Sequence, residues 1–211
     1  MILYKKGRDN MKKIKKLFCA IIVGFLFNIN AVNAEDIAAK VGDTGYPTLK
    51  EAIEAATSGE NKEVILQTDV SKDIIFSIDS NEEVILDLNK HKITSDSISN
   101  FVNNGKLTIK NGTMSMKYTG IENNENATMV LDNITYEYVV GAEIDNKGTM
   151  TIKNSTLKTD TMSTLLLNRE NGIMQLDNVT ATVGDLYKNT GKLTINSGNY
   201  TTTHNLMPNK N

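Results

Sequence analysis

Short runs of the form apolar, variable, apolar recur along most of this chain. Counted from the first apolar residue of each run, the successive separations are 20, 23, 22, 21, 24 and 19 residues. A loose repeat of this length is typical of solenoid proteins, in which each repeat forms one coil of a stack. The runs are Val64-Ile65-Leu66, Val84-Ile85-Leu86, Leu107-Thr108-Ile109, Met129-Val130-Leu131, Met150-Thr151-Ile152, Met174-Gln175-Leu176 and Leu193-Thr194-Ile195.

Within these runs, the first and third positions are apolar in every repeat. The second position is polar in four of the seven, at Thr108, Thr151, Gln175 and Thr194. Because alternate residues of a strand point to opposite faces, we expect the first and third residues in the core and the second outside. Shorter runs that contain Asn and feed into the next anchor lie at 101–105, 144–148 and 187–191. A coil therefore contains at least two strands joined by turns.

The residue after each anchor run alternates in charge through five successive repeats. These residues are Asp87, Lys110, Asp132, Lys153 and Asp177. If the coils stack in register at about 4.8 Å, an acid lies beside a base at every step. Opposite charges on neighbouring strands stabilise a sheet and like charges destabilise it, so the alternation favours this one register.

An asparagine occupies the next position in four of these repeats. These residues are Asn111, Asn133, Asn154 and Asn178. Asn tolerates tight-turn backbone angles, and equivalent amides on successive coils can hydrogen-bond along the stack. Each also begins an Asn-x-Thr triplet that resembles a glycosylation acceptor. We interpret these triplets as a turn asparagine followed by a β-prone threonine.

One segment, residues 46–56, has the pattern of a helix. Thr48 and Glu51 have the spacing of a capping box, and Leu49, Ile53 and Ala56 share one face. Gly59 and Asn61 are expected to end this helix.

The beginning of the chain has the pattern of a secretory signal. Basic residues follow Met11, residues 17–27 are apolar, and Val32-Asn33-Ala34 supplies small residues for cleavage. The apolar run is shorter than the roughly 20 residues that a membrane-spanning helix needs. We predict a signal peptide at 1–34, with Met11 as a second candidate start, and a secreted or cell-surface protein.

The 211 residues suit one domain. We expect an N-terminal strand and capping helix at 35–62, coils at 63–203 and a short tail at 204–211. Residues 1–34 hold seven of the 23 basic and one of the 25 acidic residues, so the remainder has 16 against 24 and a net charge of −8. Such a charge disfavours nucleic acid and anionic lipid, so we predict no nucleic acid partner and no stable membrane insertion after signal cleavage. The single cysteine, Cys19, lies in the signal.

The repeats at 105–113 and 148–156, together with the opening at 41–53, resemble the pectin-lyase-like superfamily of right-handed parallel β-helices. More narrowly, they resemble repeat-containing surface proteins of the adhesin type from low-GC Gram-positive bacteria. The resemblance covers about residues 38–203. It implies an all-β, single-stranded right-handed parallel β-helix whose N-terminal α-helix plugs one end of the stack. Such repeats encode stacking and say little about activity.

Polyuronate-cleaving enzymes of this superfamily use clustered aspartates with a basic residue. Here Arg169 is the only arginine after residue 34, and we interpret it as a solvated charge in a turn. The two histidines, His91 and His204, are far apart in the stack, so no metal site or triad can be built from them. An acidic group at Asp79, Glu82 and Glu83 lacks the alternating ligands of a calcium loop. We therefore expect no catalytic residue, metal or cofactor.

Tyrosines suggest a binding site instead, because exposed rings in a line can stack on sugars. Tyr136 and Tyr200 share a repeat position with Met114, Leu157 and Ala181 and are assigned to the core. The remaining candidates for ligand binding are Tyr118, Tyr138 and Tyr187.

Three functions fit these patterns. The first is a non-catalytic secreted or surface β-helix for adhesion or carbohydrate binding, with polysaccharide or a host or cell-surface glycan as the partner. The second is a structural stalk or the N-terminal fragment of a longer adhesin, and the third is a polysaccharide lyase or hydrolase. Residues 199–203 have a strand pattern close to the end of the sequence, which predicts an open solenoid end suited to self-association or continuation.

Overall fold

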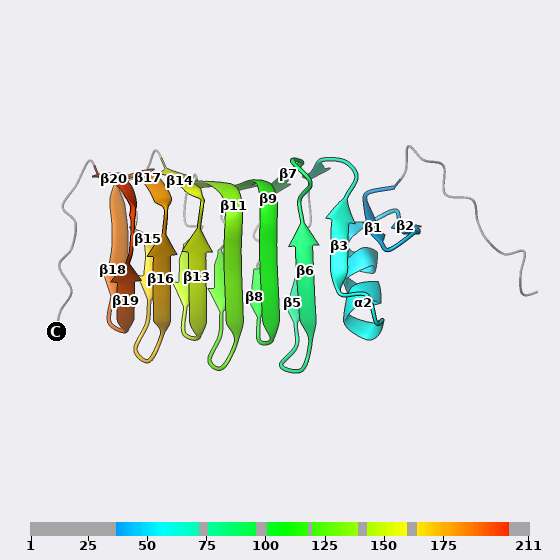
Figure 1. Cartoon of the computed structure of the whole chain (residues 1–211), viewed down its shortest axis with the longest axis horizontal. Coiled ribbons are helices and arrows are strands. Elements are labelled where there is room, and N and C mark those ends of the chain that lie inside the picture. Colours follow the sequence, from blue (N-terminus) through cyan, green and yellow to red (C-terminus); the bar gives the residue numbers. More distant parts are fainter. Residues whose placement is uncertain are drawn as a thin grey trace, which may run out of the picture. The chain divides into compact units, whose positions relative to one another are not determined.

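The computed structural model describes residues 37–71, 76–95, 101–117, 120–138, 143–159 and 164–202. They form a β-solenoid of about five turns in which parallel strands stack on one another, with one helix at its N-terminal end (Figure 1). The predicted all-β parallel solenoid with an N-terminal helix is thus confirmed. The signal at 1–34, His204 and the tail at 204–211 lie outside the described residues.

The strands of the coils form three columns along the stack. The first column contains β3 (Glu63–Leu66), β6 (Glu83–Asp87), the first parts of β9 (Lys106–Met116) and β11 (Thr128–Tyr138), β13 (Thr149–Lys153), β16 (Ile173–Asp177) and β19 (Lys192–Ile195). The second contains β4 (Val70–Ser71), β7 (Lys92–Ser95), the last parts of β9 and β11, β14 (Thr156–Thr159), β17 (Val179–Val183) and β20 (Gly198–Thr202). The third is a separate sheet of β5 (Phe76–Ile78), β8 (Phe101–Asn103), β10 (Ile121–Asn123), β12 (Ile144–Asn146), β15 (Thr164–Asn168) and β18 (Asp185–Asn189).

The anchor runs occupy the first column in the predicted register, with one exception. Val84, Leu107, Met129, Met150, Met174 and Leu193 are successive Cα partners. At the N-terminal end, however, Val64 pairs with Leu86, which shifts the first anchor by two residues. A two-residue shift preserves the inward and outward faces, so the core pattern continues through it.

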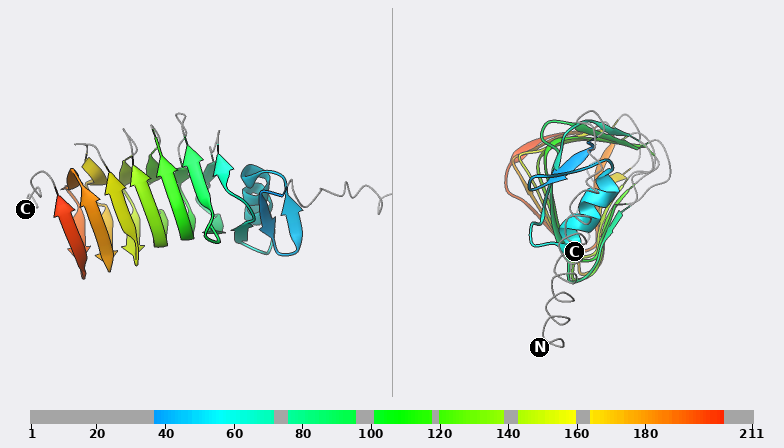
Figure 2. Two further views of the ribbon diagram at one scale, coloured as in Figure 1. Left: turned by 90° about the horizontal axis from the view of Figure 1, so that it is seen from above. Right: turned by 90° about the vertical axis from the view of Figure 1, so that its right-hand side faces the viewer.

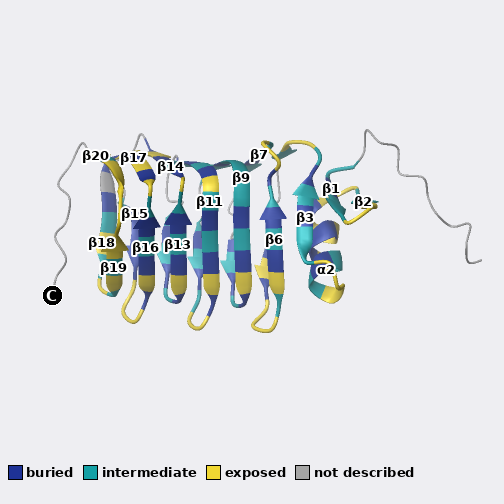
Figure 3. Ribbon diagram, in the orientation of Figure 1, coloured by how far each residue is buried: buried dark blue, intermediate teal, exposed yellow. Residues whose placement is uncertain are grey.

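The core runs along the inside of the stack. The first and third anchor residues are 0–1% exposed from β3 through β16, as the alternation predicts (Figure 3). The last coil departs from this pattern, because Leu193 is only partly buried and Ile195 is 43% exposed.

A single asparagine turns the chain at the corner between the first and second columns. Asn111, Asn133, Asn154 and Asn178 have φ angles of 61°, 55°, 51° and 53°, in the left-handed region that Asn tolerates better than most residues. The predicted tight-turn role is therefore confirmed. Because the corner is so short, β9 and β11 each continue through it as one strand.

A second series of asparagines, buried inside the stack, was not predicted. It consists of Asn103, Asn123, Asn146, Asn168 and Asn189, which are successive Cα partners in the third column. The Nδ2 group of each of the first four donates to Oδ1 of the next at 2.7–2.8 Å. These four residues are 0–1% exposed, and each amide also donates to a backbone carbonyl, so the buried polar groups are satisfied.

The helix α2 (Leu49–Ser58) closes the N-terminal end of the core. Thr48 caps it by accepting from the backbone N–H of Glu51 at 3.2 Å, as the capping-box spacing predicts. Leu49, Ile53 and Ala56, together with Ala52, are buried against β1 (Ala39–Val41), β3 and the neighbouring strands. Seen along the stack, α2 crosses its end (Figure 2), and β1 adds an antiparallel edge with β2 (Thr44–Tyr46).

Candidate functional site

The three tyrosines expected to bind ligand do not form an exposed line. Tyr138 is 2% exposed and lies in an inward series with Met116 and Thr159, so the prediction of an exposed ring is wrong. Tyr187 follows Leu166 in the inward series of the third column and packs against the core. Tyr118 lies outside the described residues. No row of these rings is available for stacking on sugars in the part of the chain that the structure describes.

The core assignment of the other two tyrosines is confirmed. Tyr136 is fully buried between Met114 and Leu157, and Tyr200 is partly buried beside Ala181 in the last coil. Burial raises the pKa of the Tyr136 hydroxyl far above its usual value of 10.0. The hydroxyl is therefore neutral at any ordinary pH and does not act as a base.

A polar groove of about 430 Å³ lies instead along the corner between the first and second columns. Three successive coils contribute to it, and the strands and corner turns hold its side chains at the spacing of the stack. Its lining residues are Asp87, Asn89, Lys90, Asn111, Gly112, Thr113, Asn133 and Thr135. The sequence patterns identified the corner asparagines but did not identify the groove. Lys90 and the two threonines form a groove only together with lining residues on neighbouring coils, which the sequence does not place beside them.

Backbone geometry shapes the part of the groove lined by Asn89 and Lys90. Asn89 and Lys90 both have positive φ angles, 48° and 69°, which turn the chain sharply after β6. The backbone N–H of Asn89 donates to Asp87 Oδ1 at 2.8 Å, and that of Lys90 donates to the carbonyl of Asn111 at 2.6 Å. Gly112 lies where an added Cβ would be 2.4 Å from the Leu88 side chain and 2.6 Å from the His91 carbonyl, so the close approach of the coils requires glycine.

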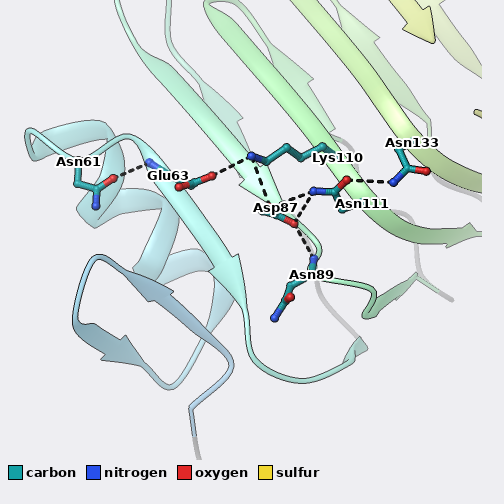
Figure 4. Close-up of polar contacts among 7 residues, drawn as sticks. All are labelled: Asn61, Glu63, Asp87, Asn89, Lys110, Asn111 and Asn133. Carbon is teal, nitrogen blue, oxygen red and sulfur yellow. Dashed lines mark hydrogen bonds and ion pairs between the residues drawn. The ribbon is translucent and has the colours of Figure 1, made fainter. Parts of the chain in front are cut away.

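Asp87 and Asn111, which line the groove, belong to a network of polar contacts that extends to Lys110 and Glu63 (Figure 4). Lys110 Nζ contacts Glu63 Oε1 at 2.9 Å and Asp87 Oδ2 at 3.4 Å, and Asp87 also accepts from the amide of Asn111 at 3.1 and 3.2 Å. The hydrogen bond with the Glu63 carboxylate, with further help from both negative charges, raises the pKa of Lys110 above 10.5. Lys110 therefore remains a cation that holds two carboxylates.

The predicted alternation of charge is confirmed in the Cα register but forms ion pairs in one direction only. Lys110 contacts Asp87, and Lys153 contacts Asp132 at 3.1 Å, each on the preceding coil. Among the described residues, neither lysine lies within 4.0 Å of the aspartate on the following coil. The column is therefore a series of separate pairs.

The corner amides hydrogen-bond along the stack, as predicted, although the chain of bonds is interrupted. Asn133 donates to Asn111, and Asn178 donates to Asn154, each at 3.0 Å. Asn154 donates to Asp132 and not to Asn133, which breaks the series. Because these amides serve as donors between coils, their structure agrees with the interpretation of the Asn-x-Thr triplets as turn and strand signals.

Two threonine hydroxyls also line the groove. Thr113 and Thr135 are outward Cα partners on β9 and β11. Within the described part of the chain, neither hydroxyl has a hydrogen-bond partner, so both can donate to and accept from a ligand.

The residues considered for catalysis have structural roles. Arg169 lies in a turn as predicted, but its charge is paired, because Nε and Nη2 contact the two carboxylate oxygens of Asp145 at 2.8 and 3.0 Å. His91 also lies in a turn, and its Nδ1 is 3.2 Å from Asp69 Oδ1. The backbone N–H of Lys92 and the ring of His91 lower the pKa of Asp69.

The acidic group at Asp79, Glu82 and Glu83 does not gather around a common point. Glu82 accepts a hydrogen bond from the backbone of Asp79 at 2.8 Å, whereas Glu83 lies near Lys106. Over the described ranges, the structure contains no group of three or more His, Cys, Asp or Glu residues arranged for a metal ion. In the same ranges, no helix is long and apolar enough to cross a membrane.

No family model matches the chain, and neither the curated proteins nor the solved structures include one with significant similarity to it.

Proposed function

We propose that this chain is an exported, non-catalytic β-solenoid that binds an extended neutral polysaccharide at the corner groove. The observation that carries the proposal is the groove itself, in which three successive coils present carboxylate, amide, ammonium and hydroxyl groups. Since these three coils repeat, a polymer of repeating sugars can meet similar groups at the successive coils that line the groove.

The lining residues match the chemistry of sugar hydroxyls. Threonine hydroxyls donate and accept, asparagine amides do both through separate atoms, and Lys90 donates only. Thr113 and Thr135 are the best candidates for direct contact because no group of the described residues hydrogen-bonds to their hydroxyls. The groove is open and lined by polar side chains, which suits recognition by hydrogen bonds. The net charge of −8 without residues 1–34 opposes binding of polyanions.

Export and surface location belong to the same proposal. They are supported by the basic, apolar and small-residue segments of residues 1–34. Membership of the pectin-lyase-like superfamily, in an adhesin-type surface branch, is likewise proposed. The solenoid, its helix-closed N-terminal end and its corner asparagines support it, and a role in adhesion to a cell-surface or host glycan would follow.

The proposal is tested by retention of the purified full chain on a panel of immobilised neutral, anionic and cationic polysaccharides. We expect retention on a neutral polymer and about thirtyfold weaker binding after Thr113→Val with Thr135→Val, because two hydrogen bonds of about 1 kcal/mol each are lost. Valine keeps the shape and the β-propensity of threonine, so the solenoid should be preserved.

The chain provides a matched control for this double variant. Thr156 and Thr180 continue the same outward series on the next two coils, beyond the residues that line the groove. The double variant Thr156→Val with Thr180→Val should bind like the unmodified chain. Equal loss in both double variants would contradict a site at the groove, and release of shortened polymer from any substrate would contradict a non-catalytic role.

A further inference from the structure

The last described coil has an exposed edge and an exposed core. Strands β18, β19 and β20 each pair on one side only, with β15, β16 and β17; within residues 37–202 as described, no strand covers the other side. Ile195 is 43% exposed, whereas Leu176, its partner on the preceding coil, is 0% exposed. Unpaired strand edges with apolar neighbours favour association.

The opposite end of the stack is closed to the same contact. There α2 buries Leu49 and Ile53 to 4% and 3% exposure over the core, and β1 runs antiparallel to β3. A second copy therefore cannot continue the parallel stack from that end. A fibre would need head-to-tail contact, so among the described residues the ends that two copies can join are the two identical open ones, and such contact closes on itself.

We propose that the open coil pairs with the same coil of a second copy of this chain, forming a two-fold symmetric, end-to-end dimer. This inference does not rest on the polysaccharide site. In the dimer the two solenoids share one continuous core, and the two capped ends lie farthest apart.

The backbone of β19 supplies the hydrogen bonds for this pairing. The N–H groups of Lys192 and Asn196 donate to Gly172 and Leu176 on the β16 side. Because successive residues of a strand alternate in direction, the N–H and C=O groups of Leu193 and Ile195 face the open edge. In an antiparallel pair centred on Thr194, Leu193 of each copy faces Ile195 of the other, and both residues present the groups that such a pair exchanges.

The side chains of β19 are complementary to themselves in this register. Leu193 and Ile195 both continue inward series of the core, so apolar residues meet apolar residues. Lys192 faces Asn196 of the other copy, and Thr194 faces its own equivalent, so no like charges oppose one another. The pairing therefore avoids the repulsion that directly opposed like charges would cause.

The same two-fold axis also brings the other two columns together. It places β18 of one copy antiparallel to β20 of the other, because the axis exchanges the second and third columns. Tyr187 and Tyr200, which are partly buried and pack against the core of the last coil, would then be covered by the partner. All three open strands of the coil gain a neighbour.

A cysteine at the centre of the interface tests the register directly. The full chain is prepared with Cys19→Ser, which removes its only native thiol, and with Thr194→Cys. Residues facing each other in a non-hydrogen-bonded antiparallel pair have Cα atoms about 4.5 Å apart, within disulfide range. We expect a covalent dimer under mild oxidation at micromolar concentration.

The control is Thr151→Cys in the same background. Thr151 is outward in the same series as Thr194, two coils further from the open end, and should remain monomeric. Selective crosslinking at residue 194 supports the proposal. Equal crosslinking of the two variants, or none at residue 194, overturns it.

A second pair of variants tests the shared core. Ile195 and Ile173 have similar exposures, 43% and 47%, but only Ile195 would be buried by the partner. Light scattering with size-exclusion chromatography should show a dimer for the unmodified chain and for Ile173→Asp, and at least hundredfold weaker dimerisation for Ile195→Asp. A monomeric unmodified chain, a larger assembly, or equal behaviour of the two variants would overturn the dimer.

Discussion

The two series of asparagines in this solenoid use the same side chain in different ways. Inside the stack, the amides from Asn103 to Asn189 form an unbroken chain in which each donates toward the C-terminal end. At the outer corner, the amides donate toward the N-terminal end. There the series ends at Asp87 and is interrupted at Asp132.

The difference follows from burial and backbone conformation. The inner residues lie on extended strands, where any β-forming residue could adopt the backbone angles, so the amide group itself explains asparagine there. The outer residues have positive φ angles and contact solvent, so backbone tolerance explains asparagine at the corner, and the hydrogen bonds add to it. Loss of an inner amide should therefore cost far more than loss of an outer one.

The largest expected effect is that of Asn146→Leu. This change removes the acceptor for Asn123 and the donor to the carbonyl groups of Gly148 and Ile173, all within the stack. Since each buried polar group left without a partner costs about 1–3 kcal/mol, we expect a loss of about 3 kcal/mol in the free energy of unfolding, measured in urea. A loss below about 1 kcal/mol would show that the inner series adds little to stability.

Asn133→Ala sharpens the comparison at the outer corner. Alanine loses the hydrogen bond to Asn111 and must also adopt a φ of 55°, so we expect a loss of about 1.5 kcal/mol. Asn133→Gly loses the same bond without the backbone cost and should be about 1 kcal/mol more stable than the alanine variant. Equal urea midpoints for the two variants would contradict the backbone explanation.

Of these two asparagine series, the sequence predicts only the outer one. Corner asparagines follow a charged residue at a fixed place after each anchor run, so their turn role and stacking could be predicted. The inner series recurs as apolar-x-Asn, once per coil. The sequence does not place it inside the stack, because three of its members begin Asn-x-Gly triplets, at Asn103, Asn146 and Asn189, and Asn and Gly close together are typical of turns.

The tyrosine predictions show a similar limit. Tyr136 was correctly placed in the core from its repeat position, and strand alternation then requires Tyr138, two residues later, to share its face. The groove could not be predicted, because it depends on the sharp turn at Asn89 and Lys90 and on the spacing of three coils. The two-residue shift of β3 arises beside the antiparallel cap, which no repeat pattern describes.

Tyr138 offers a third test, because its buried polar group differs from the inner amides in its hydrogen bonding. Its hydroxyl is enclosed and, within the described part of the chain, has no hydrogen-bond partner, unlike the inner amides. Tyr138→Phe should therefore raise the unfolding free energy by about 1 kcal/mol. Tyr138→Leu, which also removes part of the ring volume, should lower stability through a cavity. A destabilised phenylalanine variant would show that the hydroxyl is satisfied.

The smallest expected effect concerns the two lysines that pair with Asp87 and Asp132 beside the outer series. The Lys110 side chain forms ion pairs with both Glu63 and Asp87 and is 29% exposed, whereas among the described residues the Lys153 side chain pairs with Asp132 alone and is 41% exposed. Lys110→Met should cost about 0.5–1 kcal/mol and Lys153→Met less, because exposed ion pairs are weak. Urea unfolding at low salt and in 1 M NaCl separates the electrostatic part, which screening should remove.

The direction of the pH dependence provides an independent check on Lys110. Its pKa is raised in the folded chain, so its stabilising effect is complete below the unfolded-state pKa and is lost as the pH rises through the folded-state value. The stability difference between the unmodified chain and Lys110→Met should therefore shrink as the pH is raised above about 10. A difference that persists at high pH and high salt would show that the effect is not electrostatic, and the outer corner would then depend on backbone conformation and packing more than on charge.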